Sequence, residues 1–183
     1  MSVDLETQNF FVSQINTTKE IIKQFSNSKE FSPTMLINSL LSLVVLPFEQ
    51  AKKANGDKIF PGKYKDLEKK LGFSPVIFQP IKCCDGKEIK YHNKTIYSYI
   101  NKFRNGIAHQ NLIVNVNEKR EISITIYNKF NCKNCNKCKS KKCTAKGLQY
   151  SKSGIVDFKI AVTVNQLQKI ALYVADSYLN AIN

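Results

Sequence analysis

Residues 33–54 restrict the fold of this chain more than any other segment, because they combine a helix start signal with a broad apolar face. Ser32 and Pro33 are typical of a helix start, with serine as the N-cap and proline at the first helical position. The breadth of the apolar face predicts a central place in a helical bundle. Pro47 lies inside the pattern and lacks an N–H donor, so we expect a kink there.

Other segments predict the elements around this central helix. Apolar residues at helical spacing indicate helices at about residues 4–25, 63–71, 94–108 and 164–182. Segments rich in β-branched residues indicate strands at about residues 112–116, 121–127 and 155–162. We therefore expect a mainly α fold, a bundle of about four helices with a small β-hairpin or sheet appendage, in a single domain over residues 1–183.

The charge of the chain is strongly positive. Its 28 Lys and Arg residues exceed its 14 Asp and Glu residues, which gives a net charge of +14. RNA or DNA would bind such a surface, and a lysine-rich codon bias is the alternative explanation. The apolar run Leu40–Phe48 is too short to cross a bilayer, and the N-terminus lacks the pattern of a signal peptide. We expect a cytoplasmic protein with no membrane partner.

Arginine and histidine are rare in this chain, and one of each falls within residues 104–109, RNGIAH. A guanidinium can hold a phosphate with two hydrogen bonds, and an imidazole exchanges protons near neutral pH. Arg104 and His109 could thus cleave a phosphodiester without a metal. The plainer alternative is a helix C-terminus, with Gly106 ending the helix and both side chains near its last carbonyls.

The stretch Tyr99–Asn111 resembles the motif helix of small, often plasmid- or mobile-element-associated nucleases of the HEPN superfamily. Ribonucleases of that superfamily carry Arg-x4–6-His, commonly with a polar residue after the arginine. Residues 38–49 are similar to an earlier helix of that branch, and the resemblance covers roughly residues 8–130 and 155–182.

The resemblance implies a metal-independent endoribonuclease in which the 2′-hydroxyl of RNA attacks the adjacent phosphate. His109 would then be the general acid or base, Arg104 would bind the phosphate, and Asn105 would support them. Glu49 and Asn38 are weaker candidates for a supporting role, and for Glu49 we favour a solvated position. Catalysis would need no cofactor, and tRNA or mRNA could be the substrate.

Arg104 and His109 lie five positions apart, about 140° around a regular helix, so they would not share a face. The helix could unwind near Gly106, or two protomers could pair with antiparallel motif helices. The resemblance implies the second arrangement, a homodimer, and the biological role of a toxin or anti-phage defence effector with an antitoxin or immunity protein. The alternative is a non-catalytic RNA-binding or protein-interaction module of the same fold.

A segment rich in cysteine and lysine, residues 129–150, predicts an insertion loop. Its clustered cysteines favour a metal over disulfides, and the set that could hold a structural zinc is Cys132, Cys135, Cys138 and Cys143. Free thiols are the first alternative and an iron–sulfur cluster the second, because the spacing is atypical of a zinc ribbon. The lysines that we expect to bind nucleic acid are Lys133, Lys137, Lys139, Lys141 and Lys142.

Overall fold

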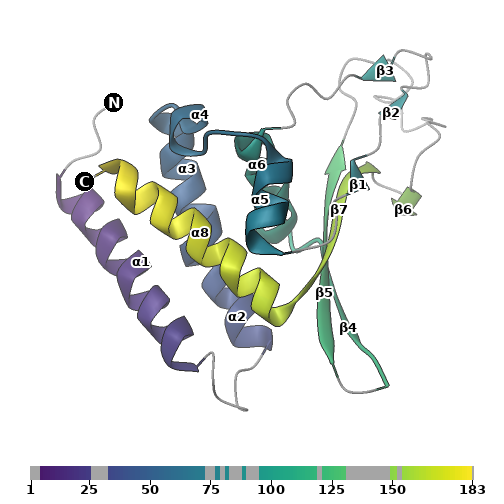
Figure 1. Ribbon diagram of the computed structural model, residues 1–183, viewed down its shortest axis with the longest axis horizontal. Helices are drawn as coiled ribbons and strands as arrows, with labels where there is room; N and C mark the ends of the chain where they lie inside the picture. Colours follow the sequence, from purple (N-terminus) through teal and green to yellow (C-terminus); the bar gives the residue numbers. More distant parts are fainter. Residues whose placement is uncertain are drawn as a thin grey trace.

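The computed structural model describes residues 5–25, 33–72, 77–78, 81–82, 88–89, 95–118, 121–130, 149–151 and 154–182. Within these residues the fold is mainly helical, with a small antiparallel sheet beside the helices (Figure 1). The predicted fold class is confirmed. The helix that carries the Arg-His motif lies between the other helices and the sheet (Figure 1).

The central helix is continuous but not uniform. It consists of α2 (Pro33–Leu40), a π-helical turn η1 (Leu41–Val45) and α3 (Leu46–Lys53). In the π-helical turn the N–H of Leu46 donates to the carbonyl of Leu41, five residues back, and Pro47 follows with no N–H to donate. The irregularity that we expected from Pro47 therefore takes the form of a widened turn immediately before it.

The central helix is also a buried helix. By length and hydropathy alone, Thr34–Lys53 could cross a membrane, which the shorter run Leu40–Phe48 did not suggest. Side chains along it are nevertheless fully buried in the bundle, namely Leu36, Leu40, Leu43, Val44 and Phe48. The central position predicted from its broad apolar face is confirmed.

Two long helices flank the central one. α1 (Leu5–Phe25) and α8 (Val164–Ile182) both contact η1, and α8 also packs against the sheet (Figure 1). The short helices α4 (Gly56–Ile59) and α5 (Tyr64–Leu71) lie between α3 and the motif helix in the chain. α8 matches its predicted bounds, whereas α4 was not predicted because one helical turn is too short to show a period.

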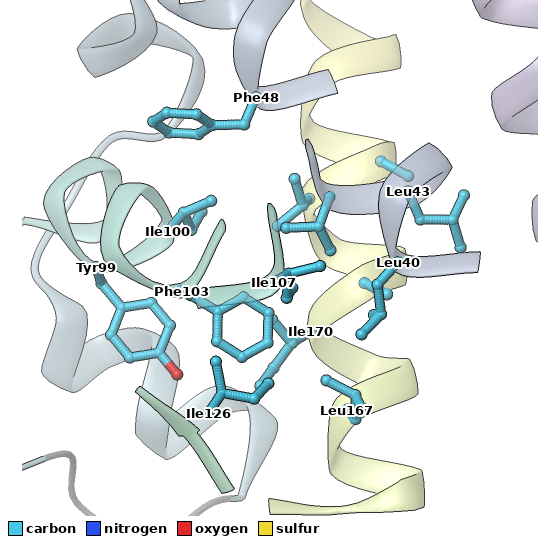
Figure 2. Packing of buried hydrophobic residues seen from close by; sticks show 14 of the residues in the cluster. Leu40, Leu43, Phe48, Tyr99, Ile100, Phe103, Ile107, Ile126, Leu167 and Ile170 are labelled. Atoms are coloured by element: carbon cyan, nitrogen blue, oxygen red, sulfur yellow. The ribbon is translucent and has the colours of Figure 1, made fainter. Parts of the chain in front are cut away.

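The motif helix, α6, spans Ile96–Ala108. Thr95 begins it as the N-cap, and its hydroxyl accepts a hydrogen bond from the N–H of Ser98 at 3.2 Å. The predicted apolar stripe is buried, as are Lys102 and Gly106, which were not predicted to be. The core that surrounds α6 is drawn in Figure 2, where the labelled residues are Leu40, Leu43, Phe48, Tyr99, Ile100, Phe103, Ile107, Ile126, Leu167 and Ile170.

The sheet extends the predicted hairpin. β4 (Leu112–Val116) pairs with β5 (Ile122–Phe130), which pairs with β7 (Gly154–Thr163), all antiparallel. Among the described residues the order is β1-β7-β5-β4, with the short strands β1 (Ile77–Phe78) and β6 (Gln149–Ser151) also pairing with β7. A separate pair joins β2 (Ile81–Lys82) to β3 (Glu88–Ile89).

The two ends of the predicted insertion loop are strands rather than loop. β5 continues through Lys129 and Phe130, and β6 includes Gln149 and Tyr150. Both strands pair with β7, which draws these ends into the sheet. The remainder, residues 131–148, lies outside the described residues.

Candidate functional site

Arg104 is held between two helices. Its Nη2 forms an ion pair with Oε1 of Glu49 on α3, and its Nη1 donates a hydrogen bond to Oδ1 of the neighbouring Asn105. The guanidinium carbon lies 6.0 Å from the centroid of the Phe48 ring, within the range of a cation–π contact. The side chain is only 17% exposed. Three different groups thus fix the direction in which the guanidinium fork points.

Burial affects the chemistry of Arg104. It lowers the pKa of the guanidinium from its ordinary value, because the charged form loses hydration. An arginine nevertheless keeps its charge at neutral pH. Its Nε is buried and has no hydrogen-bond partner among the described residues. The result is a fixed guanidinium in a partly dehydrated place, where its attraction to an anion is stronger than in bulk water and where the carboxylate of Glu49 is its present partner.

Glu49 is the supporting residue that the structure brings to the motif, and our preference for a solvated Glu49 is wrong. Its side chain is 35% exposed and pairs with Arg104 across the contact between α3 and α6. Asn38, the other weak candidate, is exposed on α2 and lines a hollow formed by residues of α1, α2 and η1. Neither Arg104 nor Glu49 lines that hollow.

His109 lies at the other end of the motif. It is the C-cap of α6, and its backbone N–H donates to the carbonyl of Asn105 at 3.0 Å. Its side chain is exposed. The next residue, Gln110, has a left-handed backbone with φ of 53°, which turns the chain from the helix toward β4. His109 therefore presents an exposed imidazole at the negative end of the helix dipole.

Gly106 does not end the helix, so the alternative that placed the helix C-terminus at this glycine is wrong, and the predicted end near Ala108 is confirmed. The helix continues to Ala108, and Gly106 is buried against β5. A Cβ at this position would lie 2.6 Å from Cγ2 of Ile126 and 2.9 Å from the carbonyl oxygen of Tyr127. The glycine is thus required for close packing of α6 on the sheet, not for a change of backbone direction.

The geometry of one chain keeps Arg104 and His109 on different sides of α6. Because the helix is not unwound at Gly106, the two residues remain about 140° apart around its axis. Arg104 faces α3, while His109 is exposed at the helix end. One protomer therefore supplies both groups without joining them in a single cleft.

Comparison with known proteins assigns this arrangement to a family. A family model described as HEPN pEK499 p136 matches residues 3–183. The chain belongs to that HEPN family. The match covers nearly the whole chain, and it confirms the resemblance to the HEPN superfamily. No curated protein and no solved structure matches the chain.

Membership of the HEPN superfamily points to a nuclease or an RNA-related module. The rarity of arginine and histidine singled out Arg104 and His109 in this HEPN chain as candidates, and the resemblance of the motif helix added Asn105. It missed Phe48, whose ring faces the guanidinium, because an aromatic residue in an apolar helix carries no sign of such a contact. The nearest available signal was its place directly before Glu49.

The predicted zinc and RNA-binding residues of this HEPN chain lie outside the described residues. This applies to Cys132, Cys135, Cys138 and Cys143, and to Lys133, Lys137, Lys139, Lys141 and Lys142. In the part that the structure does describe, no group of three or more His, Cys, Asp or Glu side chains could hold a metal ion. A zinc site in residues 131–148 stays a prediction.

Proposed function

We propose that this protein is a metal-independent endoribonuclease. The observation that carries the proposal is the held guanidinium of Arg104, fixed by Glu49 and Asn105 on a motif helix that ends in the exposed His109. Membership of the HEPN family adds to it, because this superfamily includes ribonucleases. The net charge of +14 suits an RNA substrate.

In the proposed reaction the 2′-hydroxyl of RNA attacks the adjacent phosphorus while the bond to the 5′-oxygen breaks. In the homodimer proposed below, His109 of one protomer removes the proton of the attacking hydroxyl as general base. The protonated His109 of the other protomer gives a proton to the leaving 5′-oxygen. The products are a 2′,3′-cyclic phosphate and a 5′-hydroxyl. Because DNA lacks the 2′-hydroxyl, it would not be cleaved.

Arg104 would bind the phosphate and stabilise the charge that develops on it. A guanidinium has five N–H groups, and the contacts with Glu49 and Asn105 engage two of them. Both contacts hold the fork in one plane, so the phosphate would meet a preorganised donor. Asn105 supports the site by holding Nη1 rather than by transferring a proton.

A homodimer would complete the site. Because Arg104 and His109 of one chain lie on different sides of α6, we propose that the motif helices of two chains pair antiparallel and form a shared cleft. The side of α6 that is not buried supports this pairing, because beside Tyr97 and Arg104 its side chains are small and uncharged, namely Ser98, Asn101, Asn105 and Ala108. Small side chains let two helices approach closely.

The biological role that we propose is a cytoplasmic toxin or anti-phage defence effector, acting on tRNA or mRNA and restrained by an antitoxin or immunity protein. Its support is the resemblance of Tyr99–Asn111 to nucleases of mobile elements. The proposed lysines of the Cys-Lys segment would add affinity for the RNA backbone. A zinc held by the cysteines would be structural and outside the reaction.

The test is a cleavage assay in EDTA with total RNA and a DNA of matching sequence. We expect wild-type protein to release RNA fragments that end in cyclic phosphate, and His109→Ala to reduce the rate by about 10²–10⁴-fold. His92→Ala, which removes the other histidine, is the matched control and should keep wild-type activity. Equal RNA fragmentation by wild type and His109→Ala would refute the proposal.

A second candidate is a non-catalytic RNA-binding or protein-interaction module. The ion pair between Arg104 and Glu49 favours it, because the carboxylate neutralises the guanidinium within one chain. An RNA-binding module would show salt-sensitive RNA binding without cleavage, equal for wild type and His109→Ala, whereas a protein-interaction module would show no RNA affinity beyond what salt removes. The same assay therefore separates the two functions when binding is measured beside cleavage.

A further inference from the structure

The sheet contains an irregularity on the side that faces the motif helix. Asn128 of β5 pairs with Phe158 of β7, whereas the next residue, Lys129, pairs with Val156. Asp157 therefore faces no residue of β5 across the ladder, which is the pattern of a β-bulge. A bulge redirects a side chain out of the normal alternation of a strand. Asp157 is accordingly only 1% exposed.

Both oxygens of the buried Asp157 carboxylate are held. Nζ of Lys102, on the motif helix, pairs with Oδ2, and Nδ2 of Asn128 donates to Oδ1 at 2.6 Å. Lys102 is 9% exposed and Asn128 is 7% exposed. The carboxylate on β7 thus joins β5 and α6 at one point inside the molecule.

Stability alone gives a weak reason for this arrangement. A buried ion pair loses hydration, so apolar residues of the same volume often stabilise a protein equally well or better. What an ion pair adds is position, because it needs its atoms at short range and in a defined direction. An apolar contact would tolerate a small rotation of the helix that the contact between Lys102 and Asp157 does not.

The place of Lys102 on α6 connects this contact to the candidate site. Lys102 and Gly106 lie one turn apart on the side of the helix that faces the sheet, where Gly106 packs against Ile126. Arg104 lies between them in the sequence, about 200° around the axis from Lys102. Rotation of α6 would therefore carry Arg104 away from Glu49.

We propose that Asp157 is a positioning residue of the ribonuclease site, acting through Lys102 to fix the rotation of the motif helix. This inference rests on the proposed function. Asp157 and Lys102 touch no RNA, and they act by setting where Arg104 and His109 are presented. The β-bulge is the device that turns Asp157 toward the helix.

The test removes both charges with the double variant Lys102→Met, Asp157→Asn, in which the new amide can still accept the hydrogen bond of Asn128. We expect kcat on single-stranded RNA to fall by about 10–100-fold while KM changes by less than about threefold. The matched control is Lys19→Met, Asp176→Asn, which removes the ion pair between α1 and α8 and should keep wild-type kcat. A kcat equal to wild type in both double variants would overturn the proposal.

Hydrogen exchange of the backbone amides of residues 104–109 gives a second readout that needs no activity. We expect faster exchange there in the Lys102→Met, Asp157→Asn variant and wild-type exchange in the control, whereas unchanged exchange in both would overturn the proposal. A wild-type protein that cleaves no RNA would refute the proposed function, while the exchange would still decide whether Asp157 fixes the helix. If the double variant does not fold, Asn128→Ala, which releases only Oδ1, should show the same changes at smaller size.

Discussion

At the scale of single residues, Arg104 is defined by what surrounds it. Because arginine and histidine are rare in this chain, the sequence alone drew attention to Arg104 and His109. Glu49 was only a weak candidate there, because Glu49 and Arg104 lie on helices far apart in the chain. Nothing in a helical pattern tells which exposed acid will meet which base once the helices pack. The structure supplies this pairing together with the ring of Phe48.

Replacement of Glu49 by glutamine tests whether the carboxylate orients the guanidinium. Glu49→Gln keeps the size of the side chain and loses the charged partner of Nη2. Because the pair is partly exposed, we expect a loss of stability below about 1 kcal/mol. We expect kcat on RNA to fall by about tenfold, since a looser fork is less preorganised. Single-turnover cleavage measures this fall in rate, with Glu6→Gln on α1 as the control.

Tyr99 gives a pH-dependent prediction. Burial raises the pKa of this phenol well above 10.0, where it packs against Phe103 and Phe158. The folded state then keeps a proton that the unfolded state releases, so this contribution to stability is full below about pH 10 and is lost as the pH rises further. Tyr99→Phe should lose less stability between pH 9 and 11 than wild type. Urea denaturation over this pH range measures the free energy of unfolding of both proteins. An equal fall with pH in wild type and Tyr99→Phe would contradict the assignment.

At the scale of elements, periodicity predicted the helices and strands well and their irregularities poorly. The buried stripe of α6 and the strands of the hairpin follow repeating patterns of apolar residues, so the sequence contains them. The π-helical turn before Pro47 and the bulge at Asp157 break those patterns. Each depends on contacts made by neighbouring elements, so Pro47 predicted an irregularity but not its π-helical form, and no pattern predicted the bulge. The reason for a glycine at position 106 was missed for the same cause, because it is the close approach of β5 that excludes a side chain there.

Gly106→Ala tests the contact between α6 and β5. In an ordinary helix this change stabilises by about 1 kcal/mol. Here the added Cβ would meet the carbonyl oxygen of Tyr127, which cannot move freely, and overpacking costs about 1–3 kcal/mol. We expect a net loss of stability in urea denaturation. Ala108→Gly, at the exposed end of the same helix, is the control, and a more stable Gly106→Ala would show that the interface yields.

At the scale of the whole molecule, the fold class and family could be predicted, and the assembled site could not. Four long helical patterns and a hairpin define the HEPN architecture, which the family match confirms. Arg104 and His109 come from one motif, yet the helix that carries both also separates them. Whether the two side chains can share one cleft therefore depends on how chains associate, which a single sequence does not show.

The charge of the molecule predicts how it meets RNA. If the lysines of the Cys-Lys segment contact phosphates, replacing them with glutamine should lower the slope of log affinity against log salt by up to about one per contact. The residues to replace are Lys133, Lys137, Lys139, Lys141 and Lys142. The control has the same charge change at exposed lysines of the helices, namely Lys52, Lys58, Lys65, Lys69 and Lys70. An equal slope in both variants would assign the binding to overall charge.

The pairing of Glu49 with Arg104 has a consequence for the life of the chain in the cell. During synthesis Glu49 leaves the ribosome long before Arg104, and α6 gains its contacts with β5 only when that strand has also emerged. A nascent or partly degraded chain thus contains the motif residues, but its Arg104 guanidinium is not yet oriented. Under the proposed function, the cell would therefore meet the activity only after synthesis of the chain is complete.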